Sequence, residues 1–221
     1  MKNFAVVMAF ALLATFNTDA YSNAAPVAPL PAISNISPGL KRTLDALKAR
    51  IDSDAKDCAE TAKGMNSIAQ YNYSIEKILD TGKVVAIKVS GTMLCDGVHS
   101  SSYQYGIAFE KVSGKRIDLN QIYNIATRKD GRLFVRSDLI DSVKASYREV
   151  NENNPSCLSV PGWEDELGNI PITFSPLPDG SIALYYAPPD LSSACFPVLR
   201  LDPNEFSNFR DAKRASRYEL P

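Results

Sequence analysis

The chain has 221 residues, of which 45% are hydrophobic and 22% are charged, so it is long enough and apolar enough to build a folded core. These values exclude a disordered or fibrous chain. The 24 basic and 25 acidic residues leave a formal charge of −1, which gives no overall basic field for nucleic acid, and the single histidine excludes sites that need two imidazoles.

The N-terminus has the layout of a secretory signal peptide. Lys2 precedes an apolar stretch from Phe4 to Phe16, and the small residues that follow offer cleavage after Ala20 or Ala24. A membrane anchor is the alternative, but a span needs about 20 apolar residues and this run is shorter. We therefore assign residues 1–24 to a signal peptide and expect a periplasmic or secreted protein.

Four cysteines follow, and an even number in an exported chain predicts disulfides: Cys58, Cys95, Cys157 and Cys195. Three connectivities are open, and we favour Cys58 with Cys95 and Cys157 with Cys195, because each closes a local loop. A Cys₄ metal site would need pairs two to four residues apart, which are absent. No cysteine lies at the cleavage site, so no lipid anchor is expected.

The first half of the mature chain is predicted to contain a linker, a helix and antiparallel strands. Residues 25–38 contain four prolines and form the linker. From Gly39 to about Gly64, apolar residues recur at spacings of three and four, which predicts an amphipathic helix. The pattern then changes to a period of two, and the expected strands are 71–75, 85–89, 103–109 and 117–119.

The second half predicts a helix over 138–150 and short strands over 170–175, 182–186 and 196–201. Asp202 and Pro203 can begin a further short helix. A polar tail, 210–221, is expected to fray in solvent. The fold class is α+β, with antiparallel strands and packed helices in one domain over 39–209, or in two subdomains.

The first candidate for chemistry is the segment Asp96–Ser102, in which His99 adjoins an acid and three serines. A serine nucleophile, a base and an orienting carboxylate would make a hydrolase. Neighbours on an extended segment point to opposite faces, however, and no nucleophile-elbow motif surrounds these serines. A turn with a locally bonded histidine is the favoured interpretation.

The second candidate is the run Trp163, Glu164, Asp165 and Glu166, between two glycines. An aromatic anchor beside three acids could bind a cationic protein. The alternative, which we favour, is a tryptophan that plugs the core under a solvated turn.

A third set of residues alternates along the predicted strands and could stack on sugars: Tyr71, Tyr73, Tyr103, Tyr105 and Phe109. A sheet face packed against a helix is the more common outcome of this spacing. Phosphate-binding loops are absent, and no carboxylate pair for glycoside hydrolysis can be assigned. We expect no cofactor and, given the single histidine and the cysteine spacing, no metal.

Several short motifs resemble a known domain. They are the turn Cys95–His99, the strand at 105–109, the turn at 113–115, the segment 117–123, and the strand–turn–strand around Asp179 and Gly180. Together they are similar to a bacterial extracytoplasmic domain of unknown function. That domain is shared by a lysozyme-sensing anti-sigma factor and by an accessory module of a peptidoglycan deacetylase.

The resemblance implies an α+β fold in the bacterial envelope and a binding role toward lysozyme or cell-wall material. His99 matches a histidine of the domain, and Val98 stands where the domain usually has alanine. The resemblance supplies no catalytic residue, and it covers neither the sigma-binding part of the anti-sigma factor nor the catalytic part of the deacetylase.

The leading hypothesis from the sequence is therefore an exported, non-catalytic binding module whose partner is a cationic protein such as lysozyme, or peptidoglycan fragments. An envelope hydrolase that uses His99 with a nearby serine is the alternative. A stable envelope protein with no specific ligand also stays open. We expect no nucleic-acid partner, and no membrane span after signal cleavage.

Overall fold

A computed structural model describes residues 28–221, apart from the side chains of residues 190 and 191. The predicted signal peptide lies outside these residues. The chain folds into helices and two antiparallel sheets, which confirms the α+β class. Within residues 28–221, no helix is both long and apolar enough to cross a membrane.

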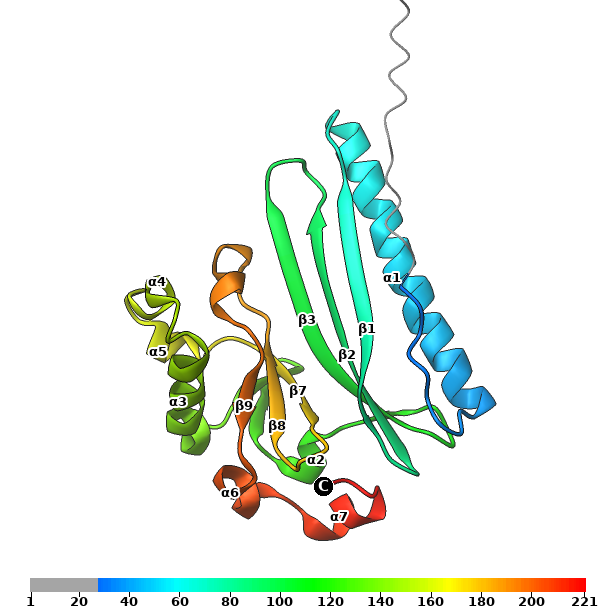
Figure 1. Ribbon diagram of the computed structural model, residues 1–221, viewed down its shortest axis with the longest axis vertical. Coiled ribbons are helices and arrows are strands. Elements are labelled where there is room, and N and C mark those ends of the chain that lie inside the picture. Colours follow the sequence, from blue (N-terminus) through cyan, green and yellow to red (C-terminus); the bar gives the residue numbers. More distant parts are fainter. Residues whose placement is uncertain (1–27) are drawn as a thin grey trace, which may run out of the picture.

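The N-terminal half is a long helix against a four-stranded sheet (Figure 1). The sheet order is β1-β2-β3-β4. The elements are α1 (Pro38–Gly64), β1 (Gln70–Asp80), β2 (Val84–Leu94), β3 (Ser100–Glu110) and β4 (Arg116–Ile117).

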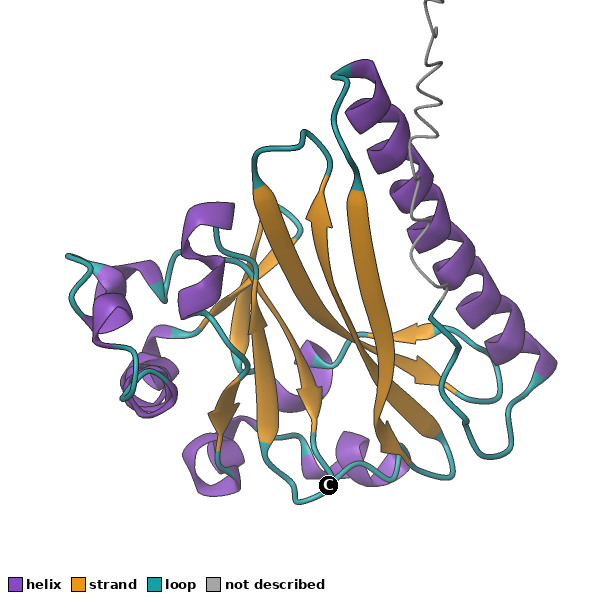
Figure 2. Ribbon diagram, turned by 45° about the horizontal axis from the view of Figure 1, so that its top comes forward, coloured by secondary structure: helices purple, strands orange, loops and turns teal. Residues whose placement is uncertain are grey.

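The C-terminal half is a five-stranded sheet, order β5-β6-β7-β8-β9, with short helices at its ends and on one face (Figure 2). Its strands are β5 (Ala126–Lys129), β6 (Arg132–Val135), β7 (Ile172–Pro176), β8 (Ile182–Tyr186) and β9 (Leu199–Leu201). Its α-helices are α2 (Asn120–Tyr123), α3 (Ile140–Val150), α4 (Pro155–Leu158), α5 (Trp163–Glu166), α6 (Pro203–Phe206) and α7 (Ala212–Arg217). The 3₁₀ helices are η1 (Ser137–Leu139), η2 (Asp190–Cys195) and η3 (Ser207–Phe209).

The apolar stripe of α1 packs on one face of the β1–β4 sheet and forms the smaller of two cores. Leu40, Leu44 and Ile51 of the helix are buried against this face, as the period of three and four predicts. On the opposite face, Val84 and Ala86 lie at the start of β2 and Ala108 lies near the end of β3. These three residues belong to the larger core, which also contains Phe174 and Leu184 of the second sheet. Among the described residues, Figure 1 shows no α-helix against the upper part of this face.

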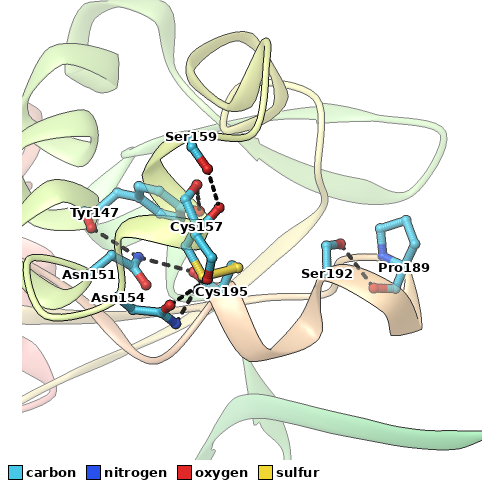
Figure 3. The surroundings of a disulfide bond; sticks show 9 residues. Tyr147, Asn151, Asn154, Cys157, Ser159, Pro189, Ser192 and Cys195 are labelled. Carbon is cyan, nitrogen blue, oxygen red and sulfur yellow. Dashed lines mark hydrogen bonds between the residues drawn. A yellow bond between two sulfur atoms is a disulfide. The ribbon is translucent and has the colours of Figure 1, made fainter.

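Both predicted disulfides are present. Cys58 joins Cys95, and Cys157 joins Cys195. Around the second bridge, Asn151 donates from its side chain to the carbonyl of Cys195 at 3.2 Å, and Asn154 donates to the sulfur of Cys157 at 3.1 Å (Figure 3). The bridge thereby holds η2 to α4.

Thiol titration of the denatured, unreduced protein is expected to find no reactive group, because all four cysteines are paired. The same protein after reduction serves as the positive control. Two or more reactive thiols before reduction would contradict the pairing.

A buried ion pair fastens the predicted linker to the first sheet. Lys111, only 2% exposed, pairs with the carboxylate of Asp80 and donates to the carbonyl of Thr81 at 2.7 Å. Ser34 of the linker donates to Asp80 from its backbone and its hydroxyl, and Ser37 donates to the Lys111 carbonyl and caps α1. The described part of the linker is therefore held against the domain.

The prediction that residues 210–221 fray in solvent is wrong. Asp211 caps α7, and Ala215 and Leu220 are buried in the larger core. The hydroxyl of Tyr123 donates to the carbonyl of Pro221 at 3.0 Å. Lys213, Arg214, Arg217 and Glu219 are exposed, whereas the partly buried Arg210 donates to the carbonyls of Leu220 and Pro221 and helps to dock the segment.

Candidate functional site

A groove of about 1360 Å³ lies between the two sheets, and we call it the inter-sheet groove. One wall is the uncovered face and free side of β1–β3, and the other is formed by β7, β8 and η2. Its volume exceeds the roughly 300–1,000 Å³ of a site for one drug-sized ligand, so the groove has room for an oligomer.

The floor of the groove is polar but uncharged over most of its width. Along β1–β3, alternate side chains face α1, so the intervening side chains face the groove. The intervening residues that line the upper floor are Asn72, Ser74, Ser90, Thr92, Ser102 and Gln104. The hydroxyls of Ser74 and Ser90 lie 3.0 Å apart and bond to each other. This face presents hydroxyl and amide groups to a ligand.

Two hydrogen bonds from β3 fix the width of the groove. The backbone N–H of Gly106 donates to the hydroxyl of Thr173 in β7 at 2.9 Å. The side chain of Gln104 donates to the carbonyl of Phe196, just after η2, also at 2.9 Å. The two sheets are therefore held together at the base of the groove, and η2 is held opposite β3.

Gly106 allows the sheets to approach closely at this point. A Cβ at this position would lie 2.4 Å from the hydroxyl of Ser175 and 2.7 Å from the ring of Tyr185, so any larger residue would push β7 and β8 away. Burial raises the pKa of Tyr185 to about 12, and the phenol therefore stays protonated at neutral pH. Tyr185 is thus part of the packed base and not a general base.

The charged side chains that line the groove are mostly basic: Lys88, Arg116, Arg128 and Arg132, with Asp118 as the one acid among them. Arg128 pairs with Asp118 at 3.0 Å. Arg116 and Arg132 are exposed and have no ion-pair partner among residues 28–221. The groove is therefore complementary to a ligand that carries carboxylates or other anions.

The His99 segment forms the exposed tip of the β2–β3 hairpin, away from the groove floor. His99 lies 2.5 Å from Asp96 through Nδ1, and its side chain is 74% exposed. Backbone N–H groups of His99 and Val98 hold the pKa of Asp96 well below its usual range. In the part of the chain that the structure describes, no serine hydroxyl is hydrogen-bonded to His99. The predicted acid and histidine are therefore paired, but no serine nucleophile is bonded to them.

The acidic run forms α5 on the outer side of the second sheet. The ring of Trp163 stacks on Tyr147 at 4.5 Å and lies under the guanidinium of Arg148. Glu164 pairs with Arg148 at 2.6 Å, and this hydrogen bond lowers the pKa of Glu164. Asp165 and Glu166 are exposed. Half of the predicted binding run is thus engaged within the protein.

The tyrosines of β1 and β3 lie on the face that α1 covers. Tyr71 and Tyr103 share a hydrogen bond at 3.0 Å, and Tyr73 donates to Asp52 of α1 at 2.7 Å. Tyr103 and Tyr105 stack at 6.2 Å and remain partly exposed at the free side of β3. Most of the five aromatic residues therefore belong to a sheet face that packs against a helix.

Across residues 28–221, no cluster of three or more His, Cys, Asp or Glu side chains could hold a metal ion. The inter-sheet groove is the feature that sequence reasoning missed. Its signal was present, because alternate residues of three neighbouring strands are neutral and polar where a solvated face commonly carries charges.

No protein-family model matches this chain, and no curated protein was found to match it. Among solved structures, the chain is similar to a DUF3298 family protein from Pseudomonas aeruginosa PAO1, with 12% identity and a TM-score of 0.42 over 65% of this chain and 63% of that one. It is also similar to a DUF3298 family member from Bacteroides fragilis NCTC 9343, with 14% identity and a TM-score of 0.44 over 83% of this chain and 74% of that one. The chain thus spans less than two thirds of the first of these proteins. The links to a lysozyme-sensing anti-sigma factor and to a peptidoglycan deacetylase stay predictions.

Proposed function

We propose that this chain is a non-catalytic binding module of the bacterial envelope, periplasmic or secreted, and that its ligand occupies the inter-sheet groove. The observation that carries the proposal is the composition of the groove, which has a hydroxyl and amide floor and, beside it, two arginines without an ion-pair partner among residues 28–221. The two disulfides are consistent with an exported protein.

Cell-wall material fits this groove better than a cationic protein does. Peptidoglycan fragments combine sugars rich in hydroxyl and amide groups with short peptides that carry carboxylates. The floor can exchange hydrogen bonds with the former, and Arg116 and Arg132 can pair with the latter. A cationic partner such as lysozyme would be repelled by the same arginines.

The groove is tested by filling it. Thr92→Trp places a large ring on the exposed floor and is expected to weaken the binding of soluble peptidoglycan fragments by at least about tenfold, measured by titration calorimetry. Val112→Trp, at an 80% exposed position outside the groove, is the matched control and should bind as the wild type does.

Equal affinity of the Thr92→Trp and Val112→Trp variants would place the ligand elsewhere. No measurable binding of the fragments by the wild type would reject cell-wall material as the ligand.

A cationic protein would have to use the acidic run, and this surface makes a separate prediction. Because the ring of Trp163 stacks on buried Tyr147, Trp163→Ala is expected to lower the melting temperature. Charge reversal of Asp165 and Glu166 should leave the melting temperature unchanged, because both residues are exposed.

Surface-plasmon kinetics with lysozyme at two salt concentrations test whether the acidic run binds a cationic protein. A slower association for the reversed variant, with weaker salt dependence, would favour this binding.

The hydrolase alternative depends on His99. Its exposed pair with Asp96 has no bonded serine, so His99→Ala is expected to leave any hydrolysis of an ester or peptidoglycan substrate unchanged. Loss of such an activity at an unchanged melting temperature would promote the hydrolase.

A further inference from the structure

We infer that the free edge of β3 accepts an extended acidic peptide as an added strand. The inference rests on the inter-sheet groove being the ligand site proposed above, and it defines how one part of the ligand is held.

The first observation is an unequal pairing of β3. On one side β3 pairs with β2 from Ser100 to Glu110, and on the other side β4 pairs only with Ala108 and Phe109. Among the described residues, the part of β3 before Ala108 therefore has no paired strand on its second side, where Gly106 bonds to the Thr173 side chain of β7, and the groove runs along that side.

The second observation is the direction of the backbone groups. In an antiparallel ladder, successive residues alternate between pointing their N–H and C=O groups at one neighbour and at the other. The N–H of Glu110 donates to the Lys115 carbonyl at 2.9 Å and that of Gly106 to Thr173, so even-numbered residues point away from β2. Ser102 and Gln104 share this parity. Within residues 28–221 their backbone groups have no partner on the open side.

The third observation is that this edge lacks the features that normally protect an edge strand. Exposed edges are usually interrupted by charges, prolines or bulges, because a regular edge recruits other strands. The outer edge of β1 has such features, with a register shift between Lys77 and Leu79 and charged residues beside it. The segment of β3 over residues 100–108 has no charge and no proline, and its register with β2 is unbroken.

The charges beside the edge select the occupant. Arg116 belongs to β4, and Arg132 to β6, and both line the groove without an ion-pair partner among the described residues. A strand with carboxylates on alternate residues would meet these guanidinium groups. A second copy of this chain would instead bring the arginines of both copies together, which disfavours edge-to-edge dimers.

The partly exposed rings of Tyr103 and Tyr105 add apolar surface for the alternate side chains of such a strand. Strand addition would then combine main-chain hydrogen bonds from Ser102 and Gln104 with side-chain selection by the arginines and tyrosines.

The test uses two fluorescein-labelled octapeptides, one of alternating glutamate and valine and one of alternating lysine and valine, with binding followed by fluorescence anisotropy. We expect the glutamate peptide to bind the wild type and the lysine peptide not to bind. Ser102→Pro removes an N–H that points away from β2, so the ladder to β2 remains while the peptide loses a partner. We expect its Kd to be about tenfold or more above that of Ser102→Ala, which loses the same hydroxyl but keeps the backbone N–H.

Arg132→Glu keeps the inference testable if Ser102→Pro does not fold, because residue 132 is exposed. It is expected to weaken the glutamate peptide and to reduce the salt dependence of its binding. In hydrogen–deuterium exchange, the peptide should slow the exchange of the Ser102 and Gln104 amides of the wild type, whose N–H groups point away from β2.

The inference is overturned if the wild type does not bind the glutamate peptide, if both peptides bind equally, or if folded Ser102→Pro binds as well as Ser102→Ala. Dimer formation through this edge would also overturn it. The peptidoglycan-fragment titration separates this result from the proposed function, because fragments that bind while the glutamate peptide does not would leave the function standing and reject strand addition alone.

Discussion

Asp80→Ala is expected to lower the free energy of unfolding by about 3–5 kcal/mol, which is the typical cost of leaving a buried charge without its partner. The Lys111 side chain is 3% exposed and its ammonium pairs with Asp80. In the variant, the charge keeps only the neutral oxygens of Ser34 and Thr81. Chemical denaturation followed by circular dichroism measures the loss.

The reverse truncation and the double variant complete a thermodynamic cycle. Lys111→Met should cost less than Asp80→Ala, because Asp80 retains Lys77 at 3.0 Å and the bonds from Ser34. The double variant Asp80→Ala/Lys111→Met should recover much of the loss, since no buried charge remains. A loss below about 1 kcal/mol for Asp80→Ala would show that the pair does not fasten the linker.

The same pair predicts a dependence of stability on acid pH. Burial raises the pKa of Asp80, but the hydrogen bonds from Lys111, Ser34 and Lys77 outweigh it and hold the pKa well below its usual range. Since the carboxyl of the unfolded chain titrates near pH ~4, its ionised form stabilises the folded state above that pH. The contribution is lost as the pH falls toward the folded-state pKa. Asp80→Ala should therefore show a flatter decline of stability in acid.

The sequence was sufficient for the elements with strong periodicity. The α1 stripe was readable because Leu40, Leu44, Ile51 and Cys58 repeat over several turns, and the disulfides followed from loop locality. The β5–β6 hairpin was missed, although Asp130 and Gly131 form its turn. Each of its strands has only four residues, and exposed basic residues break the apolar alternation.

The polar floor had a signal in the sequence, but the groove itself could not be predicted, because it depends on how two sheets are placed relative to each other. That placement is fixed by contacts distant in sequence, such as Gly106 with Thr173 and Gln104 with Phe196. The period of two along β1–β3 assigns each residue to one face of the sheet. It does not show whether that face contacts solvent, a helix or a second sheet. The docked tail was missed for the same reason, since Ala215 and Leu220 are too few to form a pattern.

The final prediction compares the two disulfides, because they differ in their relation to the groove. Cys157→Ala/Cys195→Ala and Cys58→Ala/Cys95→Ala should each lose roughly 4 kcal/mol of stability in the chain-entropy model, since the bridges close loops with separations of 38 and 37 residues. Their effects on binding should diverge. Cys195 ends η2, whose residues Ser193 and Ala194 line the groove wall, whereas the Cys58 bridge joins α1 to the end of β2 on the other face.

Loss of the Cys157–Cys195 bridge is therefore expected to weaken ligand binding as well as stability, because η2 loses its covalent link to α4 and is then held by hydrogen bonds such as those from Gln104 to the Phe196 carbonyl and from Asn151 to the Cys195 carbonyl. Loss of the other bridge should reduce stability alone. Titration with peptidoglycan fragments, at a temperature where both variants are folded, measures the difference. Equal affinities would mean that η2 does not contribute to the site, and the ligand would then have to be held by β1–β3 and the arginines without the opposite wall.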